Sequence, residues 1–379
     1  MTALRDENFR AMENLFARAA GETRGILLEH EIYAVLREAG FRVPAALFVT
    51  ERAALGALAL DRLGGDTVVC KLISPLMPHR TEYGGVRFAP RSPKALADIF
   101  DDFERIASKA AVDFAGMLVA EFVPGSDGIP RQLLISLRQD PAFGPVVFCG
   151  LGGVGTELYQ RSLLPEKGLF MRPAALVRDR AATAKALGET LFYPMVAGET
   201  RGSAGALVEG EKLVASLERF ACIAERFSRR STASPYTVEE LEVNPLQITE
   251  AGELVPLDAL MRVSTEKRLE ANAPEELIRR LLRPESALVV GASASKVNSG
   301  RIILRNLASG GGVPRDRIYC LHPDAAEIDG CRAFSDIEAL PEKTDMTVFT
   351  VPADEKAALL LDRLIERGST ASITIISAG

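Results

Sequence analysis

The chain has 379 residues, of which 47% are hydrophobic and 25% charged, so it is long enough for two or three globular domains with ordinary cores. Its formal charge of −6 excludes the basic face of a general nucleic-acid binder. It contains no apolar run of the roughly 18 residues that a membrane-spanning helix needs. Its five cysteines are scattered and include no CxxC pair, as in a protein that keeps its thiols reduced. These features predict a cytoplasmic protein with no nucleic-acid partner and no membrane association.

The first predicted element is an amphipathic helix within residues 1–24, because apolar residues recur there every three or four positions. A second helix is predicted over 27–40, where the same spacing ends at a glycine. It carries His30, for which a structural or surface role is expected. Apolar runs bounded by turn residues predict the strands that follow, and longer periodic runs predict helices. Strands are expected over 41–50, 67–73, 117–123, 131–137, 145–151, 240–248 and 253–263, and helices over 51–64, 92–111 and, in several pieces, 174–227.

A charged, proline-punctuated segment over 264–286 marks a boundary, after which strands and helices alternate. This alternation predicts a doubly wound parallel sheet of Rossmann type and places the whole chain in the α/β class. We expect an N-terminal helix at 1–24, a main module at 25–265, a helical linker at 266–284 and a partial Rossmann-like domain at 285–379. In that domain, strands are expected over 286–293, 317–323, 345–352 and 372–379, and helices over 300–309 and 353–368.

Oxygen-bearing side chains gather near the end of the main module. Glu242 and Asn244 are two residues apart on a predicted strand, so both point to one face of the sheet. Asp258 lies on the next strand and returns beside them if the two strands pair as a hairpin. A few side-chain oxygens, completed by phosphate oxygens, form the ligand set that Mg²⁺ prefers. The alternative is a polar hairpin that faces solvent.

Three further features fit a nucleotide site. Lys71 ends a buried apolar strand, which is a costly position for an ammonium group without an anionic partner. Glu121 has apolar neighbours, and a glycine follows shortly after it, as in a hinge that binds a base and a ribose. The glycine-rich stretch over 150–157 allows the backbone to approach phosphates closely, although a tight packing turn is an equally good interpretation.

Taken in order, the stretches "KLISPLMPHRTEYGGV", "DPAFGPVVFCGLGGVGTEL" and "LEVNPLQI" with "LVPLDAL" resemble the ATP-grasp module of ADP-forming acyl-CoA synthetases. That family includes ADP-forming acetate–CoA ligase and is related to succinyl-CoA synthetase. The segment from "RPESALVVGAS" through "NSGRIILRNL" and "YCLHP" to "ISAG" is similar to the family's CoA-binding domain. The resemblance covers roughly residues 25–379.

The resemblance implies an ATP-grasp module of two α+β lobes followed by a Rossmann-like CoA-binding domain. It implies an acid–thiol ligase that makes acyl-CoA from a small carboxylic acid, CoA and ATP through an acyl phosphate and a phosphohistidine. The implied cofactors are ATP/ADP, Mg²⁺ and CoA. The implied partners are an oligomeric assembly and a ligase domain or subunit that carries the phosphohistidine. The acid itself is not identified.

The resemblance also assigns roles to individual residues. The residues that it assigns to ATP are Lys71, Glu121, Phe122, Val123 and Gln132. Asn244 and Asp258 are assigned to the magnesium ion, with Glu242 beside them. The residues that it assigns to CoA are Gly291, Ala292, Ser293 and Pro323.

His79 lies in a loop bounded by prolines and glycines, where the family has a histidine that passes a phosphoryl group between a phosphohistidine and the nucleotide. Imidazole accepts phosphoryl groups near neutral pH, and such a loop can move. The resemblance therefore implies a catalytic role for His79. The alternative is a solvated loop residue.

The chain departs from the family pattern at several positions. Gln132 stands where the family usually has glutamate, Ser136 where it has glycine, and His322 where it has asparagine. The family normally continues beyond "TIISAG" with a ligase domain that holds the principal phosphohistidine, and it commonly has a different domain order. Two alternatives stay open: a nucleotide- and CoA-binding regulatory or scaffold protein without turnover, and an ATP-grasp enzyme that uses an amine acceptor.

Overall fold

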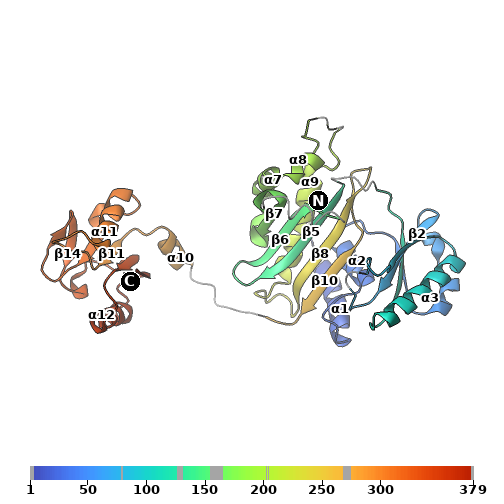
Figure 1. The fold of residues 1–379 in the computed structure, drawn as a ribbon, viewed down its shortest axis with the longest axis horizontal. Coiled ribbons are helices and arrows are strands. Elements are labelled where there is room, and N and C mark those ends of the chain that lie inside the picture. Colours follow the sequence, from blue (N-terminus) through green and yellow to red (C-terminus); the bar gives the residue numbers. More distant parts are fainter. Residues whose placement is uncertain are drawn as a thin grey trace. The chain divides into compact units, whose positions relative to one another are not determined.

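The computed structural model describes residues 4–77, 80–125, 131–153, 165–201, 203, 205–267 and 275–376. The chain forms two compact units, Met1–Leu269 and Glu270–Gly379 (Figure 1). The finer boundaries expected at residues 24, 265 and 284 remain predictions. All five cysteines have free thiols, and four of them are buried. Within the described ranges, no helix is both long enough and apolar enough to cross a lipid bilayer.

The first lobe of the first unit is built on a four-stranded antiparallel sheet. Its strands follow the order β1 (Ala46–Val49), β4 (Gly116–Glu121), β2 (Thr67–Ile73) and β3 (Val86–Pro90). Helix α3 (Pro93–Lys109) starts with Ser92 as its N-cap and buries Leu96, Phe100, Phe103 and Ala107 at helical spacing. These residues share one core with β2 and β4.

The helix expected over 51–64 is wrong. The structure has two short 3₁₀ segments instead, η1 (Arg52–Ala57) and η2 (Leu60–Arg62), separated by an extended Leu58. Gly56 weakens helix formation in this stretch. The break lets Leu55 and Leu63 both enter the core, where each is almost fully buried. Burial of these leucines therefore decides the local conformation.

The second lobe contains a six-stranded antiparallel sheet in the order β10-β8-β5-β6-β7, with β9 also paired to β8. The strand expected over 253–263 is interrupted. It forms β9 and β10, and Leu257 and Asp258 lie between them. The interruption faces Pro245 of β8, which has no N–H to give to the ladder but accepts a hydrogen bond from the amide of Leu257 at 3.0 Å. The strands are β5 (Gln132–Asp140), β6 (Gly144–Leu151), β7 (Leu169–Pro173), β8 (Thr237–Ile248), β9 (Leu254–Pro256) and β10 (Ala259–Ser264).

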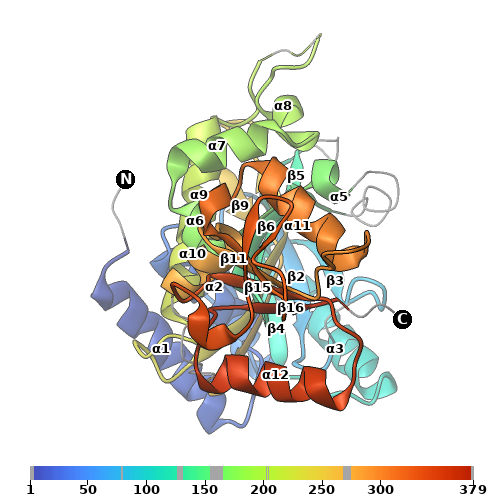
Figure 2. The ribbon, with the colours of Figure 1, turned by 90° about the vertical axis from the view of Figure 1, so that its left-hand side faces the viewer.

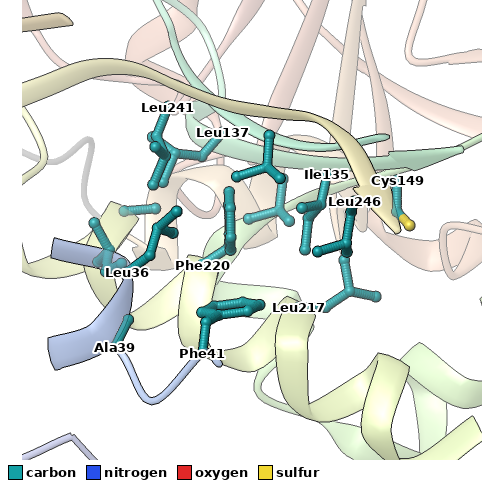
Figure 3. Packing of buried hydrophobic residues seen from close by; sticks show 14 of the residues in the cluster. Leu36, Ala39, Phe41, Ile135, Leu137, Cys149, Leu217, Phe220, Leu241 and Leu246 are labelled. Atoms are coloured by element: carbon teal, nitrogen blue, oxygen red, sulfur yellow. The ribbon is translucent and has the colours of Figure 1, made fainter. Parts of the chain in front are cut away.

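Helices cover one face of this sheet and build the largest core of the protein. Figure 3 shows Phe220 and Leu217 of one helix packed with Leu36 and Phe41 against the strands. The sheet supplies Ile135, Leu137, Cys149, Leu241 and Leu246 to the same core. Besides α3, the described part of the unit contains α1 (Asp6–Gly21), α2 (Glu29–Glu38), α5 (Pro165–Gly168), α6 (Ala174–Val177), α7 (Arg180–Gly188), α8 (Phe192–Val196) and α9 (Gly210–Arg226).

Replacing Phe220 with alanine should remove the centre of this core. Phe220 is fully buried and meets Phe41 edge to face at 5.7 Å between ring centroids. We expect the free energy of unfolding to fall by about 3–5 kcal/mol, because transfer and cavity costs add. Chemical denaturation measures this loss. Phe143→Ala, at a position that is 70% exposed, is the matched control and should change stability by less than about 0.5 kcal/mol.

The second unit is a six-stranded sheet in the order β13-β14-β12-β11-β15-β16, parallel except for β13. Helices α11 and α12 lie on opposite sides of β11 and β15 (Figure 2), each over its own core. The parallel sheet confirms the Rossmann-like α/β prediction, although β13 and β14 were missed. The elements are α10 (Glu275–Leu282), β11 (Ala287–Val290), α11 (Ser299–Gly310), η3 (Arg315–Arg317), β12 (Ile318–Leu321), β13 (Glu327–Ile328), β14 (Cys331–Phe334), η4 (Ile337–Ala339), β15 (Met346–Phe349), α12 (Glu355–Glu366) and β16 (Ile373–Ile375).

Candidate functional site

A cavity of about 360 Å³ opens in the first unit beside the start of α2, the end of β2, the middle of β8 and the first half of β10. Figure 1 shows α2 between the two sheets that carry these strands. The polar residues at the cavity include Glu29, Arg80, Glu242, Asn244 and Asp258. Residues from three distant parts of the chain therefore meet at one place.

Asn244 and Asp258 lie next to each other at this cavity. The amide of Asn244 donates to the carbonyl of Asp258 at 3.0 Å, where β8 and β10 pair Val243 with Ala259. Asn244 Oδ1 accepts the amide N–H of Gly153 at 2.8 Å, and Asp258 Oδ1 accepts that of Ala259 at 2.8 Å. Backbone contacts thus fix both side chains, as the hairpin argument from the sequence requires.

Glu242 lines the same cavity from β8, two residues before Asn244. Burial raises the pKa of its carboxyl group, and Arg138, whose Nη2 is 3.6 Å from Glu242 Oε2, offsets only part of this effect. Burial likewise raises the pKa of Asp258, and the neighbouring Arg80 acts in the opposite direction. Two carboxyl groups with disfavoured charges therefore face one cavity, which favours a cationic ligand between them.

Lys71 belongs to a buried ionic cluster directly beside the cavity. Its ammonium group, in a side chain that is only 8% exposed, lies 2.5 Å from Glu29 Oε1 and 3.3 Å from the hydroxyl of Tyr33. Its third donor contacts the carbonyl of Leu257, in the break that precedes Asp258. The anionic partner that the sequence demanded for Lys71 is therefore Glu29 in this structure.

Arg80 completes the cluster and links it to the candidate metal ligands. Its Nη2 donates to Glu29 Oε2 and, at 2.5 Å, to Asp258 Oδ1. Burial opposes the charged guanidinium, but the carboxylates of Glu29 and Asp258 outweigh it and raise the pKa of Arg80. Arg80 and Lys71 in turn outweigh the burial of Glu29 and lower its pKa.

Glu121 lies apart from these residues, at a second cavity of about 270 Å³. In the paired strands it stands opposite Val68, whereas Lys71 stands opposite Leu118. Phe122 and Val123 line the second cavity with Glu121, and none of the described residues lines both cavities. Among the described residues, Glu121 thus lines a different cavity from Asn244 and Asp258.

Gln132 begins β5, beside the glycine-rich segment. Its amide Nε2 donates to Gln247 Oε1 at 3.3 Å, and its carbonyl accepts the amide of Gly152 at 2.8 Å. Gly153 has φ +79°, a backbone conformation that favours glycine, and a Cβ atom there would lie 1.8 Å from Gln132 Oε1. His79 and residues 154–164 of the glycine-rich region lie outside the described residues.

The other two histidines have structural surroundings. The ring of His30 stacks on Phe48 with 4.0 Å between the centroids, and burial lowers its pKa. His322 Nδ1 accepts the backbone N–H groups of Asp324 at 3.2 Å and Ala325 at 3.0 Å. His322 therefore stabilises a turn in the way that asparagine does at such positions.

The second unit holds a tight turn between β11 and α11. Gly291 has φ +99° in this turn, and Ala292 is buried behind it. Asn298 caps α11, because its Oδ1 accepts the amides of Ser293 at 3.2 Å and Arg301 at 3.0 Å, and its Nδ2 donates to the carbonyl of Gly291. Pro323 lies exposed in the turn after the neighbouring strand β12. The arrangement is a strand, a turn and a helix N-terminus, the geometry that accepts phosphate groups.

The sequence analysis missed Glu29, Tyr33 and Arg80. Glu29 had a detectable signal, because it lies three and four residues before Ile32 and Tyr33 on the buried face of α2. A carboxylate on an apolar helix face needs a partner. Arg80 gave no such signal, since its loop has no periodicity.

Comparison with known proteins supports the resemblance. A family model described as an ATP-grasp domain matches residues 18–263, and one described as a CoA binding domain matches residues 285–378. The chain is 28% identical over 331 residues to acetate–CoA ligase (ADP-forming) II of Archaeoglobus fulgidus, covering 86% of this chain and 43% of that protein. It is 26% identical over 234 residues to acetate–CoA ligase (ADP-forming) I subunit beta of Pyrococcus furiosus, covering 61% and 89%. The chain thus spans less than half of the first relative.

The solved structures agree. The dinucleotide-forming acetyl-coenzyme A synthetase 1 of Ca. Korarchaeum cryptofilum, in complex with coenzyme A, Ca-AMPCP and HgCl⁺, is similar with a TM-score of 0.53 and 25% identity, over 66% of this chain and 99% of that one. A second structure of that protein, with coenzyme A, gives a TM-score of 0.53 over 67% and 100%. The expected resemblance to ADP-forming acyl-CoA synthetases and the expected fold class are confirmed.

Proposed function

Since this chain belongs to the ATP-grasp domain family and also carries a CoA-binding domain, we propose that it serves an ADP-forming acid–CoA ligase. The reaction is carboxylic acid + CoA + ATP to acyl-CoA + ADP + phosphate, through an acyl phosphate. The observation that carries this proposal is the convergence of Asn244, Asp258 and Glu242 on one cavity beside Lys71 and Arg80. A nucleoside triphosphate bound with its metal ion needs oxygen ligands for the metal ion and cationic side chains for the phosphates.

The residues at the cavity fit magnesium. Asn244 and Asp258 offer an amide oxygen and a carboxylate oxygen from adjacent strands, the hard ligands that Mg²⁺ takes when phosphates complete its shell. Among the described residues, no group of three or more histidine, cysteine, aspartate or glutamate side chains could hold a metal by itself. When bound, the ion neutralises phosphate oxygens during transfer. Glu242 lies beside this pair and Lys71 places a positive charge behind it.

The second cavity suits the adenosine part of the nucleotide. Glu121 at the end of β4 can accept hydrogen bonds from hydroxyl or amino groups, and the main chain of Phe122 and Val123 supplies further donors and acceptors. We place Gln132 near the phosphates, because it adjoins the glycine-rich segment. Glutamine there keeps one acceptor oxygen, adds N–H donors and carries no negative charge.

We assign phosphoryl transfer to His79, on the resemblance of its loop. One imidazole nitrogen takes the γ-phosphoryl group as ADP leaves, and then passes it toward a ligase domain or partner subunit. CoA is assigned to Gly291, Ala292 and Ser293 in the turn between β11 and α11, with Pro323 just after the neighbouring strand β12. The phosphates of CoA would meet backbone N–H groups there.

The direct test follows labelled phosphate. The full chain is incubated with Mg²⁺, ATP labelled in its γ-phosphate, CoA and a panel of small carboxylic acids, and label on protein, ADP and thioester are measured. ATP-dependent labelling of the protein and acid-dependent ADP formation support the ligase. Binding of both ATP and CoA without any phosphoryl transfer would instead identify a non-catalytic binding protein.

The second unit should bind CoA in preference to NAD. No GxGxxG fingerprint follows β11, where the chain reads Gly291-Ala292-Ser293, so the dinucleotide pyrophosphate lacks its usual turn. We expect the Kd for CoA to be at least about tenfold lower than that for NAD, by isothermal titration calorimetry. A titration with NAD binding and no CoA binding would contradict this assignment.

Gly300→Ala should specifically disturb that site. A Cβ atom at Gly300 would lie 2.6 Å from Thr350 Oγ1 and 2.7 Å from the carbonyl of Gly291, so α11 must move away from the turn. We expect overpacking to cost about 1–3 kcal/mol in stability and CoA affinity to fall. Gly310→Ala, in the same helix with no atom within 4 Å of the new Cβ, is the control and should bind CoA normally.

A further inference from the structure

Arg80 has one hydrogen-bond donor to spare. The residue is only 8% exposed and lines the main cavity. Its Nη2 serves Glu29 and Asp258, and its Nη1 donates to the carbonyl of Leu72 at 3.4 Å. The Nε N–H is buried and has no partner among the described residues. A buried donor without an acceptor is costly, so this group is suited to an acceptor that arrives with a ligand.

The charges of the cluster are balanced only while Asp258 is free of metal. Two carboxylates, Glu29 and Asp258, face two cations, Lys71 and Arg80. A divalent ion at Asp258 would stand beside the guanidinium that now contacts the same carboxylate at 2.5 Å. Like charges at such a distance repel strongly in a partly buried site. Arg80 must therefore give up Asp258 when the metal ion binds.

Glu29 limits where Arg80 can go. Glu29 is almost completely buried on α2 and holds the same Nη2 that contacts Asp258. The guanidinium therefore stays at the cavity when Asp258 releases it. It then has two N–H groups in need of acceptors, Nε and the one freed from Asp258. A planar pair of donors of this kind matches two oxygens of a phosphoryl group.

We propose that Arg80 is an exchangeable counter-ion of the nucleotide site. In the nucleotide-free protein it neutralises Asp258, and in the loaded protein it binds the terminal phosphoryl group of the nucleotide while the metal ion takes Asp258. This inference rests on the proposed function, because it uses the same cavity. The exchange makes the metal ion and the nucleotide bind cooperatively. The metal ion displaces the guanidinium from Asp258, and the phosphoryl group then accepts the hydrogen bonds of that guanidinium. The exchange also weakens the binding of a divalent ion in the absence of nucleotide.

The test measures Mn²⁺ and nucleotide separately on the full chain. Mn²⁺ binding without nucleotide is followed by electron paramagnetic resonance, and ADP binding at saturating Mn²⁺ by calorimetry. In Arg80→Gln, Mn²⁺ alone should bind about tenfold more tightly, because its competitor at Asp258 is gone. ADP should bind about tenfold more weakly, because the phosphoryl contact is lost. Opposite changes in Mn²⁺ affinity and ADP affinity are expected only from a residue that contacts Asp258 in the free protein and the phosphoryl group in the loaded protein.

Three further variants test whether the effect is specific to the pairing of Arg80 with Asp258. Arg262→Gln removes a cation at the border of the same cavity that pairs with Glu240 at 3.4 Å and leaves Asp258 untouched, so it should change neither affinity. Asp258→Asn in the Arg80→Gln background should abolish the gain in Mn²⁺ affinity. Glu29 keeps Lys71 as a partner in Arg80→Gln, which favours folding. If that variant nevertheless fails to fold, Arg80→Lys decides, because lysine keeps the positive charge beside Asp258 but lacks the planar pair of donors for two phosphoryl oxygens, so nucleotide binding alone should weaken.

Parallel weakening of Mn²⁺ and ADP binding would make Arg80 a structural residue and overturn the inference. So would unchanged affinities for both. A wild-type chain that binds Mn²⁺ but no nucleotide would overturn the proposed function and the phosphoryl contact together. In that event, tighter Mn²⁺ binding by Arg80→Gln would still support the pairing of Arg80 with Asp258, so the two failures are distinguishable.

Discussion

Replacing His79 with alanine is expected to lower phosphoryl transfer from ATP by about 10²- to 10⁴-fold, the range for loss of a group that takes part directly in the chemistry. Pro75 and Gly84 flank the segment and disfavour helix and strand there, so we expect folding not to depend on the His79 side chain. ATP affinity and the thermal unfolding midpoint should therefore stay close to those of the wild type. Labelling of the protein from γ-labelled ATP, by rapid quench, measures the rate.

His322→Asn is a suitable control for that experiment. Asparagine can accept the same turn N–H groups that His322 Nδ1 accepts from Asp324 and Ala325, so phosphoryl transfer should be unchanged. Full transfer activity in His79→Ala would reduce His79 to a solvated loop residue. An equal loss in both variants would show that the assay does not report on a particular histidine.

Asp258→Asn should weaken Mg·ATP binding by at least about 100-fold, because even the loss of outer-shell partners commonly costs 10–100-fold in metal affinity. This corresponds to about 2.8 kcal/mol. Stability should fall by less than half as much, since asparagine keeps an oxygen for the amide of Ala259 and Arg80 keeps Glu29. Calorimetric titration with Mg·ATP and chemical denaturation of the same samples give the two quantities.

Glu240→Gln is the matched control for Asp258→Asn. Glu240 lies on β8, close to the site, and forms ion pairs with Arg138 at 2.7 Å and Arg262 at 3.4 Å. Its replacement removes a carboxylate from the same sheet without removing a candidate metal ligand. Equal losses of Mg·ATP affinity in both variants would argue that general charge, not a metal contact, is what Asp258 contributes.

Strands buried on both faces were predictable from the sequence. Strand β2 has exactly the expected limits, Thr67–Ile73, because an apolar run between turn residues leaves little choice of register. Strand β3 was missed because Phe88 and its neighbours at this sheet edge are largely exposed and show no buried stripe. Strand β13 is only two residues long, too short for a periodic signal, and β14 is buried only at Cys331, so it shows no continuous buried run.

The site was predictable where it depends on local register. The two-residue spacing of Glu242 and Asn244, and the return of Asp258 beside them, follow from one antiparallel pair. Contacts between distant segments were not predictable in this way. Arg80 meets Asp258 across 178 positions of sequence, and neither loop has a periodic pattern that would align them. Only the packing of α2 against β10 brings their common neighbour Glu29 into place.

The most direct measurement is a crystal structure of the full chain grown with Mg²⁺, a non-hydrolysable ATP analogue and CoA. We expect the metal ion on Asn244 and Asp258, the adenine beside Glu121, and CoA phosphates at the N-terminus of α11. In the same crystal, Arg80 should have left Asp258 for the terminal phosphoryl group. A nucleotide bound away from Asn244 and Asp258, with the contact between Arg80 and Asp258 intact, would contradict these expectations.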